Sequence, residues 1–308
     1  WFAARACLDR ARILHAEEPF GLVHGHVGLP DGLAALLLGR SLGIPTVATL
    51  YGSEALLKAR SNVLHRAALG WTLRRLDRVV ALSRALAEAG RRLSGVRDIR
   101  VIPHVADEKL FHPQSRTSAR KKLRLPGRGW MVLFVGSLAP VKGLSDLLKA
   151  WSLLPRGTGK LVLVGQGPLR GDLERQASGL GLAGELVFAG AQPRKAIPAW
   201  MAACDALVLS SLSEGLPTVM MEAMLSARPV VTTSVGGIPE VIQDGRTGFL
   251  VPASDPQAMA EALQKLRRLG PKTGPMVKRA RALVLGRHTL PAAAGSLDAL
   301  YRELVGRP

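Results

Sequence analysis

Two glutamates separated by seven residues stand where an expected strand gives way to an expected helix. Glu214 follows the short apolar run 206–210, which is typical of a buried parallel strand. Glu222 lies more than one turn into the helix expected over 217–227. Carboxylates in these two places can accept hydrogen bonds from hydroxyl groups. The pair therefore indicates a ligand that presents hydroxyls at two separate points.

The residues between the two acids are suited to holding an anion. Pro217 fits the first position of a helix, because its missing N–H would have no partner within the helix. Gly215, followed by Leu216, lets the backbone approach a ligand closely. The N–H groups of Thr218 and Val219 would point out of the helix start, where the dipole favours negative charge. A phosphate between two hydroxyl-binding acids describes a nucleotide-sugar, which is the ligand we predict.

A purely structural explanation of the two glutamates stands beside the functional one. Glu214 can be a helix-entry acid that the dipole favours, and Glu222 can be a solvated helical residue. The surroundings of Glu222 favour function, because apolar residues flank it at 219, 221, 223 and 225. An acid in apolar surroundings costs free energy unless something pairs with it.

The composition of the chain limits the classes of protein to which it can belong. Its 308 residues are enough for two domains, and 47% of them are hydrophobic. No apolar run approaches the ~20 residues that a membrane-spanning helix needs. The two cysteines, Cys7 and Cys204, lie in different halves, so a disulfide framework is not expected and a cytoplasmic location is favoured.

The formal charge of +19 calls for an anionic partner or a solvated basic surface. Aromatic residues make up 4% of the chain and are not interleaved with the basic clusters, so we predict no nucleic-acid binding. A solvated, arginine-rich surface is the first explanation. The second is weak peripheral contact with anionic lipid at the inner face of the membrane, through the region 58–97.

Strands and helices alternate along the chain, which predicts an α/β fold with parallel sheets. Strands are expected over 21–25, 45–50, 78–82, 99–102, 131–135, 160–164, 185–189, 206–210 and 229–233. Helices are expected over 31–42, 54–76, 85–93, 143–154, 168–179, 194–203, 217–227 and within 255–305. The proline-containing, basic segment 103–128 is interpreted as the crossing between two domains.

Residues 130–255 resemble family 4 of the retaining glycosyltransferases. The matching segments are 134–143 (FVGSLAPVKG), 163–169 (LVGQGPL), 187–190 (VFAG), the segment around Glu214 and Glu222, 227–240 (ARPVVTTSVGGIPE) and 244–251 (DGRTGFLV). A looser resemblance continues through 24–26, 30–32, 49–53 and 102–107. The resemblance implies the GT-B fold, an α/β fold in which two Rossmann-like, doubly wound parallel-sheet domains face each other across a cleft.

The resemblance divides the chain into three parts. Residues 1–125 would be an acceptor-side Rossmann-like domain, and residues 126–285 the domain that binds the nucleotide-sugar. Residues 286–308 would pack back on the first domain through a stripe of Leu297, Leu300, Tyr301 and Leu304. Only about four strands precede the crossing and the chain opens on Trp1, so we expect the first domain to be truncated.

The implied activity moves a hexosyl or related unit from a nucleotide-diphosphate sugar to a glycan or lipid-linked acceptor, in envelope or exopolysaccharide synthesis. By resemblance, Glu222 binds the ribose hydroxyls and Glu214 a hydroxyl of the donor sugar. Residues 215–219 present amides to sugar and phosphate, and the loop with Gly136 and Ser137 faces the donor. Glu214 and Lys142 are the candidate catalytic residues.

Lys142 also points to phosphate on its own evidence. It follows a strand and a glycine-containing loop and precedes a helix, where the dipole disfavours a cation that has no anion nearby. Its ammonium can neutralise the departing diphosphate, on which negative charge develops in an oxocarbenium-like transition state. The chain has no Asp-x-Asp pair to hold a divalent ion. We therefore predict no essential metal and no cofactor.

Two departures from the family pattern leave a second function open. Ser137 stands where the family usually has a phosphate-binding arginine, for which Arg170 or Arg194 are candidate substitutes, and Tyr51 stands where it usually has histidine. A catalytically silent subunit that only binds nucleotide is therefore the alternative. A generic Rossmann oxidoreductase is rejected, because Gly165-Gln166-Gly167 lacks the third glycine of the dinucleotide-binding pattern.

His24 and His26 form an H-x-H pair at a strand end. Two ligands without a nearby acid or cysteine are weak evidence for a metal. We place His26, with Tyr51, on the acceptor side, and the alternative is that the histidines are ordinary strand-end residues.

Overall fold

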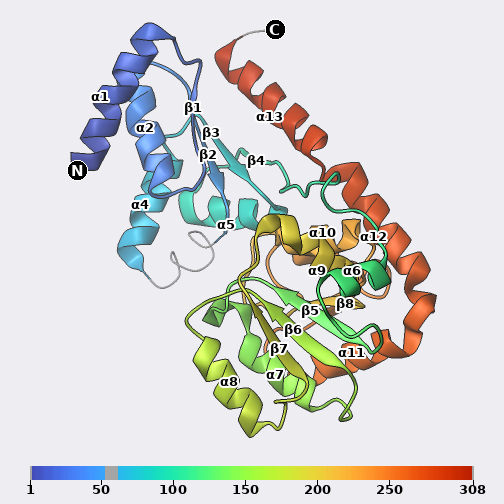
Figure 1. The fold of residues 1–308 in the computed structure, drawn as a ribbon. Helices are drawn as coiled ribbons and strands as arrows, with labels where there is room; N and C mark the ends of the chain where they lie inside the picture. The colour runs from blue at the N-terminus through green and yellow to red at the C-terminus, as the bar shows by residue number, and fades with distance from the viewer. Residues whose placement is uncertain (1, 53–61, 307–308) are drawn as a thin grey trace. The chain divides into compact units, whose positions relative to one another are not determined.

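The computed structural model describes residues 2–52 and 62–306, with side chains from residue 8 onward. The chain forms two compact units (Figure 1), which are described separately. Unit 1 contains Trp1–His104, Glu214–Leu216 and Pro291–Pro308. Unit 2 contains Val105–Ser213 and Pro217–Leu290.

Unit 1 is built on a four-stranded parallel sheet with the strand order β1-β2-β3-β4. The strands are β1 (Val23–Gly25), β2 (Thr46–Leu50), β3 (Arg78–Ala81) and β4 (Ile99–Val101). The helices are α1 (Phe2–Glu17), α2 (Asp31–Leu42), α4 (Val63–Leu73), α5 (Arg84–Ser94) and α13 (Leu290–Val305). Asn62 and Ser83 begin α4 and α5 by accepting hydrogen bonds from backbone N–H groups of the first turn, as helix-capping side chains do.

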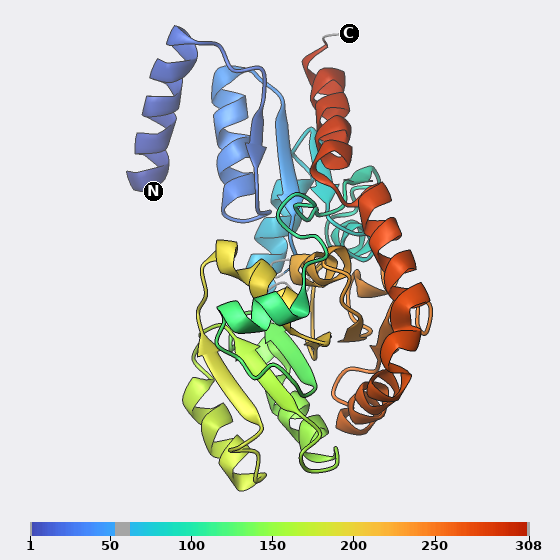
Figure 2. The same ribbon diagram turned by 45° about the vertical axis from the view of Figure 1, so that its right-hand side comes forward.

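Alternate residues of the strands fill two separate cores in unit 1. Ala48, Leu50 and Val79 point to one face, where they pack with the buried leucines of α2, α4 and α5. Val47 and Val80 point to the other face, where Leu300 of α13 covers them with Leu297 and Leu304 at its side. Figure 2 shows β2 between α2 and α13, with α1 lying against α2.

Unit 2 is built on a six-stranded parallel sheet with the order β10-β9-β8-β5-β6-β7. Its strands are β5 (Met131–Val135), β6 (Lys160–Val164), β7 (Leu186–Gly190), β8 (Ala206–Leu209), β9 (Val230–Thr233) and β10 (Phe249–Val251). In chain order this is the doubly wound arrangement 3-2-1-4-5-6, whose order reverses between β5 and β8. In such sheets ligands bind outside the carboxyl ends of the strands at the reversal.

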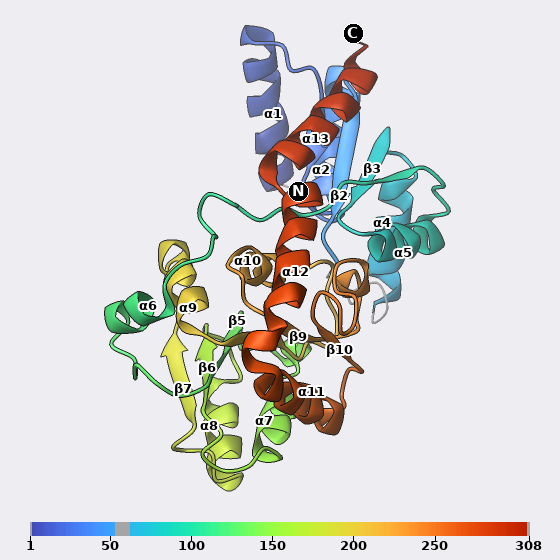
Figure 3. The same cartoon turned by 90° about the vertical axis from the view of Figure 1, so that its right-hand side faces the viewer.

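Helices cover both faces of this sheet. They are α6 (Arg116–Lys122), α7 (Leu144–Ser152), α8 (Arg170–Gly179), α9 (Ile197–Ala203), α10 (Thr218–Leu225), α11 (Pro256–Leu269) and α12 (Gly274–Arg287). The helices α7, α8 and α11 pack together, whereas α9 and α10 lie on the opposite face. Figure 3 shows α6 against α9 and α12 against α10.

The α/β class with two parallel sheets, predicted from the sequence, is confirmed. The helix expected over 54–76 is described as α4 over 63–73, and residues 53–61, with the start of the basic region 58–97, lie outside the described residues. Among the described residues, the α-helices α1 and α6, the latter within the 103–128 crossing, and the strand β10 were not predicted. Throughout the described ranges, the helices are too short or too polar to traverse a bilayer.

Candidate functional site

The carboxyl ends of β5 and β8 form the candidate site in unit 2. These strands are direct neighbours, with Leu133 opposite Leu207 in the parallel ladder. Gly136 and Ser137 follow β5, and Ser210 follows β8. The chain leaves the two strands toward opposite faces of the sheet, and ligands of doubly wound folds bind at this edge. Two of the predicted donor-binding residues, Gly136 and Ser137, lie at this edge of the sheet.

Lys142 is anchored to the segment that follows β8. It ends the short 3-10 helix Pro140–Lys142, and its carbonyl accepts a hydrogen bond of 2.8 Å from Ser210 Oγ. The N–H of Leu212 donates to the carbonyl of Val141 at 2.8 Å. Gly143 completes the turn with φ of 60°, and a Cβ there would lie 2.1 Å from the Ser210 carbonyl oxygen. Only glycine allows this approach, so the close contact fixes the backbone conformation of the turn that carries Lys142.

The loop that carries Gly136 and Ser137 is held by the neighbouring β6 loop. Gly136 N–H donates to the Val164 carbonyl at 3.0 Å. A Cβ on Gly165, whose φ is 149°, would lie 1.8 Å from the Gly136 carbonyl oxygen. The backbone of one loop therefore lies directly on the backbone of the other, and Gly136 cannot move independently of β6.

Helix α10 starts at this same edge. Thr218 is its first residue, and Pro217 precedes the helix in an extended conformation. The sequence prediction that Pro217 occupies the first helical position is therefore wrong by one residue. The correction leaves the N–H groups of Thr218 and Val219 in the first turn, where helix geometry directs them away from the helix body. The first turn holds no acidic side chain, so the positive end of the helix dipole is not offset within it.

Glu222 is a buried carboxylate with a cationic partner. It is 5% exposed, and its Oε1 accepts a hydrogen bond of 3.2 Å from Arg194 Nη1. Burial raises the pKa of Glu222, Arg194 opposes that rise, and nearby Asp107 adds to it. The Arg194 side chain is 62% exposed and lies over the Phe111 ring at 5.7 Å. Because its side chain is largely exposed, Arg194 can turn toward a ligand without losing its contact with water.

The sequence did not predict that Arg194 is the residue that pairs with Glu222. The apolar neighbours of Glu222 predicted that something must pair with it, but Arg194 precedes it by 28 positions on another loop. Of the two substitute cations suggested by the sequence, Arg194 reaches this site. Arg170 pairs with Glu174 at 2.6 Å and lies over the Phe188 ring at 4.3 Å.

The residues Glu214–Leu216 are grouped with unit 1 rather than with the helix that follows them. Gly215 is buried, and a Cβ there would lie 2.3 Å from the Tyr51 carbonyl oxygen. Glu214 is half-buried. Tyr51 also reaches His26, with 3.3 Å between the hydroxyl and Nδ1. Unit 1 thus brings the acceptor-side candidates His26 and Tyr51 together.

His24 lies beneath His26 and is held at both ring nitrogens. Its Nδ1 is 2.6 Å from the Tyr301 hydroxyl and its Nε2 is 2.8 Å from Thr49 Oγ1. The His24 and His26 rings stack with 4.6 Å between centroids. Burial, and then the nearby His26, lower the pKa of His24 to about 4. Both ring nitrogens of His24 therefore contact protein groups, and its ring packs on His26.

The predicted site residues therefore fall into two groups. Unit 2 holds those at the ends of β5 and β8, namely Gly136, Ser137, Lys142, Pro217, Thr218, Val219 and Glu222. Unit 1 holds Glu214, Gly215, Leu216, His26 and Tyr51. Across residues 2–52 and 62–306, histidines, cysteines and acids do not gather in threes that could hold a metal ion.

Comparison with known proteins identifies the family. Residues 115–283 match the family described as Glycosyl transferases group 1, and residues 2–110 match Glycosyltransferase Family 4. The chain belongs to the group 1, family 4 glycosyltransferases. It is 32% identical over 246 residues to a putative teichuronic acid biosynthesis glycosyltransferase of Bacillus subtilis, covering 79% of this chain and 60% of that relative. It is 30% identical over 293 residues to a D-inositol 3-phosphate glycosyltransferase of Frankia alni, covering 85% and 70%.

Solved structures of glycosyltransferases show the same fold. A sucrose-phosphate synthase of Thermosynechococcus elongatus matches with a TM-score of 0.88 and 26% identity, over 97% of this chain and 77% of that one. Anabaena HepE in complex with UDP-glucose matches with a TM-score of 0.86 and 22% identity, over 96% and 82%. The two parallel-sheet units therefore have the GT-B fold.

Proposed function

We propose that this chain transfers a hexosyl or related unit from a nucleotide-diphosphate sugar to a glycan or lipid-linked acceptor, with retention of anomeric configuration. One observation supports this most. The turn that carries Lys142 is bonded to the segment after β8, at the strand-order reversal where α10 also begins. A cation and a helix N-terminus at one sheet edge are suited to a diphosphate.

Each donor group has a protein partner in this proposal. Lys142 and the N–H groups of Thr218 and Val219 bind the diphosphate. Glu222 accepts hydrogen bonds from the ribose hydroxyls, which replace or share the bond from Arg194. Glu214, four positions before Thr218 in the chain, binds a hydroxyl of the donor sugar.

Stabilisation of the leaving group supplies most of the catalysis. Negative charge develops on the departing diphosphate while the sugar becomes oxocarbenium-like, and pre-positioned cations and amides stabilise that charge. Arg194 supplies the second positive charge that Ser137 cannot. The reaction then proceeds without a divalent metal and without a cofactor, so EDTA leaves the rate unchanged.

The acceptor is a glycan or lipid-linked sugar of envelope or exopolysaccharide synthesis in this proposal. The B. subtilis relative is described as acting in teichuronic acid biosynthesis, and the F. alni relative as acting with D-inositol 3-phosphate. His26 and Tyr51 contact the acceptor, and His24 holds His26 in place through ring stacking.

Calorimetry with UDP, GDP and ADP tests the donor site. We expect one of them to bind, and Glu222→Ala to weaken that binding by about tenfold, the scale of one hydrogen bond to a charged group. Glu261→Ala, on the exposed surface of α11, is the matched control and should bind as wild type does. If none of the three nucleotides binds, the proposed donor site is wrong.

A transfer assay separates the enzyme from a silent nucleotide-binding subunit. The full chain is incubated with the nucleotide-sugar whose nucleotide binds, with and without EDTA, and release of nucleotide is followed. We expect release that EDTA does not abolish. Binding without hydrolysis or transfer to any acceptor would favour the silent subunit, whereas release that requires a metal would contradict the metal-independent mechanism.

A further inference from the structure

A pocket of about 440 Å³ lies at the amino-terminal edge of the unit 2 sheet. Trp130, Asp205 and Pro229, which line it, directly precede β5, β8 and β9. The candidate donor site lies at the carboxyl ends of the same strands. In parallel strands these are opposite edges of one sheet, so the pocket is separate from the donor site.

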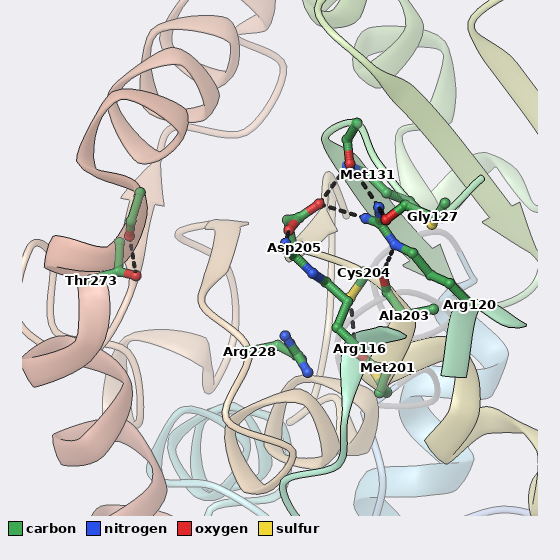
Figure 4. Close-up of polar contacts among 12 residues, drawn as sticks. Arg116, Arg120, Gly127, Met131, Met201, Ala203, Cys204, Asp205, Arg228 and Thr273 are labelled. Carbon is green, nitrogen blue, oxygen red and sulfur yellow. Dashed lines mark hydrogen bonds and ion pairs between the residues drawn. The ribbon is translucent and has the colours of Figure 1, made fainter. Parts of the chain in front are cut away.

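The pocket wall carries more positive than negative charge. Arg116, Arg228 and Arg267 line it, against the single acid Asp205. Asp205 is already neutralised, since Arg116 bonds its Oδ1 and Arg120 bonds its Oδ2 at 2.9 Å. The N–H of Met131 also donates to Oδ2 at 2.8 Å. Figure 4 shows Asp205 at the centre of these contacts.

Arg120 makes this neutralisation permanent. It is 1% exposed, and its guanidinium also donates to the carbonyls of Ala203 and Gly129, each at 2.9 Å. A buried arginine bonded on three sides cannot leave Asp205 without a large desolvation cost. Asp205 is therefore not available to offset the remaining two arginines of the pocket.

Arg228 keeps unused hydrogen-bonding capacity. Its Nε is buried and has no hydrogen-bond partner among residues 2–52 and 62–306. Its Nη2 reaches the Gln114 carbonyl at 3.3 Å, which is long for such a bond. Arg228, Asp205 and Thr273 all line the pocket, and Figure 4 labels the three of them. A guanidinium has five donors, so beyond the Nη2 bond to Gln114 the terminal Nη groups of Arg228 have N–H donors for an anion in the pocket.

Two further features of the wall favour an anion. Arg267, in the last turn of α11, is exposed and donates to Thr158 Oγ1 at 3.3 Å. Thr273 and Gly274 place the first turn of α12, the positive end of a 14-residue helix, on the same wall. Two arginines and a helix N-terminus on the wall of one pocket favour a phosphate group.

The apolar residues of the lining indicate that the ligand has an organic part besides its phosphate. Trp130, Pro229 and Leu266 are apolar, and the Trp130 ring is fixed by stacking on Trp151 at 5.7 Å and 9°. A volume of this size suits a small organic molecule. We infer that this pocket binds a small phosphate ester, with its phosphate on Arg228 and Arg267 and its body against Trp130.

Calorimetry with glucose 6-phosphate and phenyl phosphate tests the inference on the full chain. We expect at least one probe to bind, and Arg228→Gln and Arg267→Gln each to weaken it by about tenfold or more. Arg175→Gln removes an exposed charge on α8, away from the pocket, and should bind as wild type does. Lys142→Ala should also leave the affinity unchanged, because Lys142 lies at the opposite sheet edge.

The outcomes separate this site from the donor site. Arg267 is exposed, so its variant folds even if loss of the partly buried Arg228 does not allow folding. The inference is overturned if neither probe binds, or if Lys142→Ala weakens binding and Arg267→Gln does not. Nucleotide calorimetry remains independent, because Arg267→Gln should bind UDP, GDP or ADP as wild type does.

Discussion

At the scale of single residues, the ion pair with Arg194 explains how the buried carboxylate of Glu222 is tolerated in an apolar helix before a ligand binds. Burial of Glu222 raises its pKa, and the exposed Arg194 compensates only in part. The charged form of Glu222 is therefore less favourable in the folded chain than in water. Hydroxyl donors from a ligand would restore hydrogen bonds that the carboxylate lost on folding.

Glu222→Gln should make the chain more stable at neutral pH. Glutamine copies the protonated side chain, so the variant avoids the cost of a buried charge. The pKa of Glu222 in the folded chain is raised above 4.5. Its contribution to the free energy of unfolding is therefore favourable below pH 4.5 and is lost as pH rises through the folded pKa. The gain of the variant in free energy of unfolding should thus shrink as pH falls toward 4.5. Urea unfolding between pH 4 and pH 8 measures it, with Glu261→Gln as the exposed control.

His24 shows the opposite pH dependence. Its folded pKa of about 4 lies below the ordinary value of 6.5, so the unfolded chain binds the proton more readily between these values. Wild type should lose stability as pH falls from 6.5 to 4. The loss should be on the order of 1 to 2 kcal/mol, a figure reduced for the partial exposure of His24. His24→Gln should lack this part of the pH dependence, and the exposed His112→Gln should keep it. A flat wild-type profile would contradict the burial of His24.

The sequence predicted the properties of a residue that depend on its neighbours along the chain. It did not predict contacts between residues that are distant in the chain. The apolar neighbours of Glu222 were enough to predict a buried acid in need of a partner. The bond from Arg194 depends on where the loop after β7 ends, which no spacing along the chain records. The same holds for His24, whose partners Thr49 and Tyr301 lie 25 and 277 positions away.

At the scale of elements, the loops after β5 and β6 are placed by glycines that lie on each other's backbone. The close approach of Gly165 to Gly136 keeps the loop with Ser137 at the end of β5. Short apolar strands and glycine turns predicted most of these elements. The helix α6 was missed because its sequence RTSARKK shows no apolar face.

Gly165→Ala should destabilise unit 2 by about 1 to 3 kcal/mol, because its φ of 149° and its contact with Gly136 leave no room for a methyl group. Gly179→Ala is the matched control, since a Cβ at the end of α8 meets nothing within 4 Å. The control should be neutral or stabilising by up to about 1 kcal/mol. Denaturant midpoints of the two variants measure the difference, and equal midpoints would show that the two loops do not touch.

At the scale of the whole molecule, each of the two units has its own sheet and its own core. The alternation of strands and helices predicted two parallel sheets. The strand order was beyond sequence reasoning, because the reversal between β5 and β8 depends on which face each connection takes. That reversal places the turn that carries Lys142 beside the segment that follows β8.

The last helix should contribute to the stability of unit 1 alone. Leu300→Ala should cost about 2 to 5 kcal/mol, because Leu300 is 3% exposed and packs on Val47 and Val80. Leu290→Ala, in the same helix but 63% exposed, should change stability by less than about 0.5 kcal/mol. Hydrogen exchange of the backbone amides of unit 1 measures the stability change of each variant. A measurement on one unit is needed because a chain of two units need not unfold in a single two-state step. Equal effects of the two variants would contradict the packing of α13.

The central claim is that a cation and helix amides at the end of β5 and β8 hold a diphosphate. Its most direct test takes the one of UDP, GDP and ADP that binds, and compares the affinities of this diphosphate and of its monophosphate for wild type, Lys142→Ala and the control Lys149→Ala, whose lysine pairs with Asp146 on α7. The account predicts that Lys142→Ala weakens binding of the diphosphate by about tenfold or more and weakens binding of the monophosphate less, and that the control changes neither. Undiminished binding of the diphosphate by Lys142→Ala would contradict it.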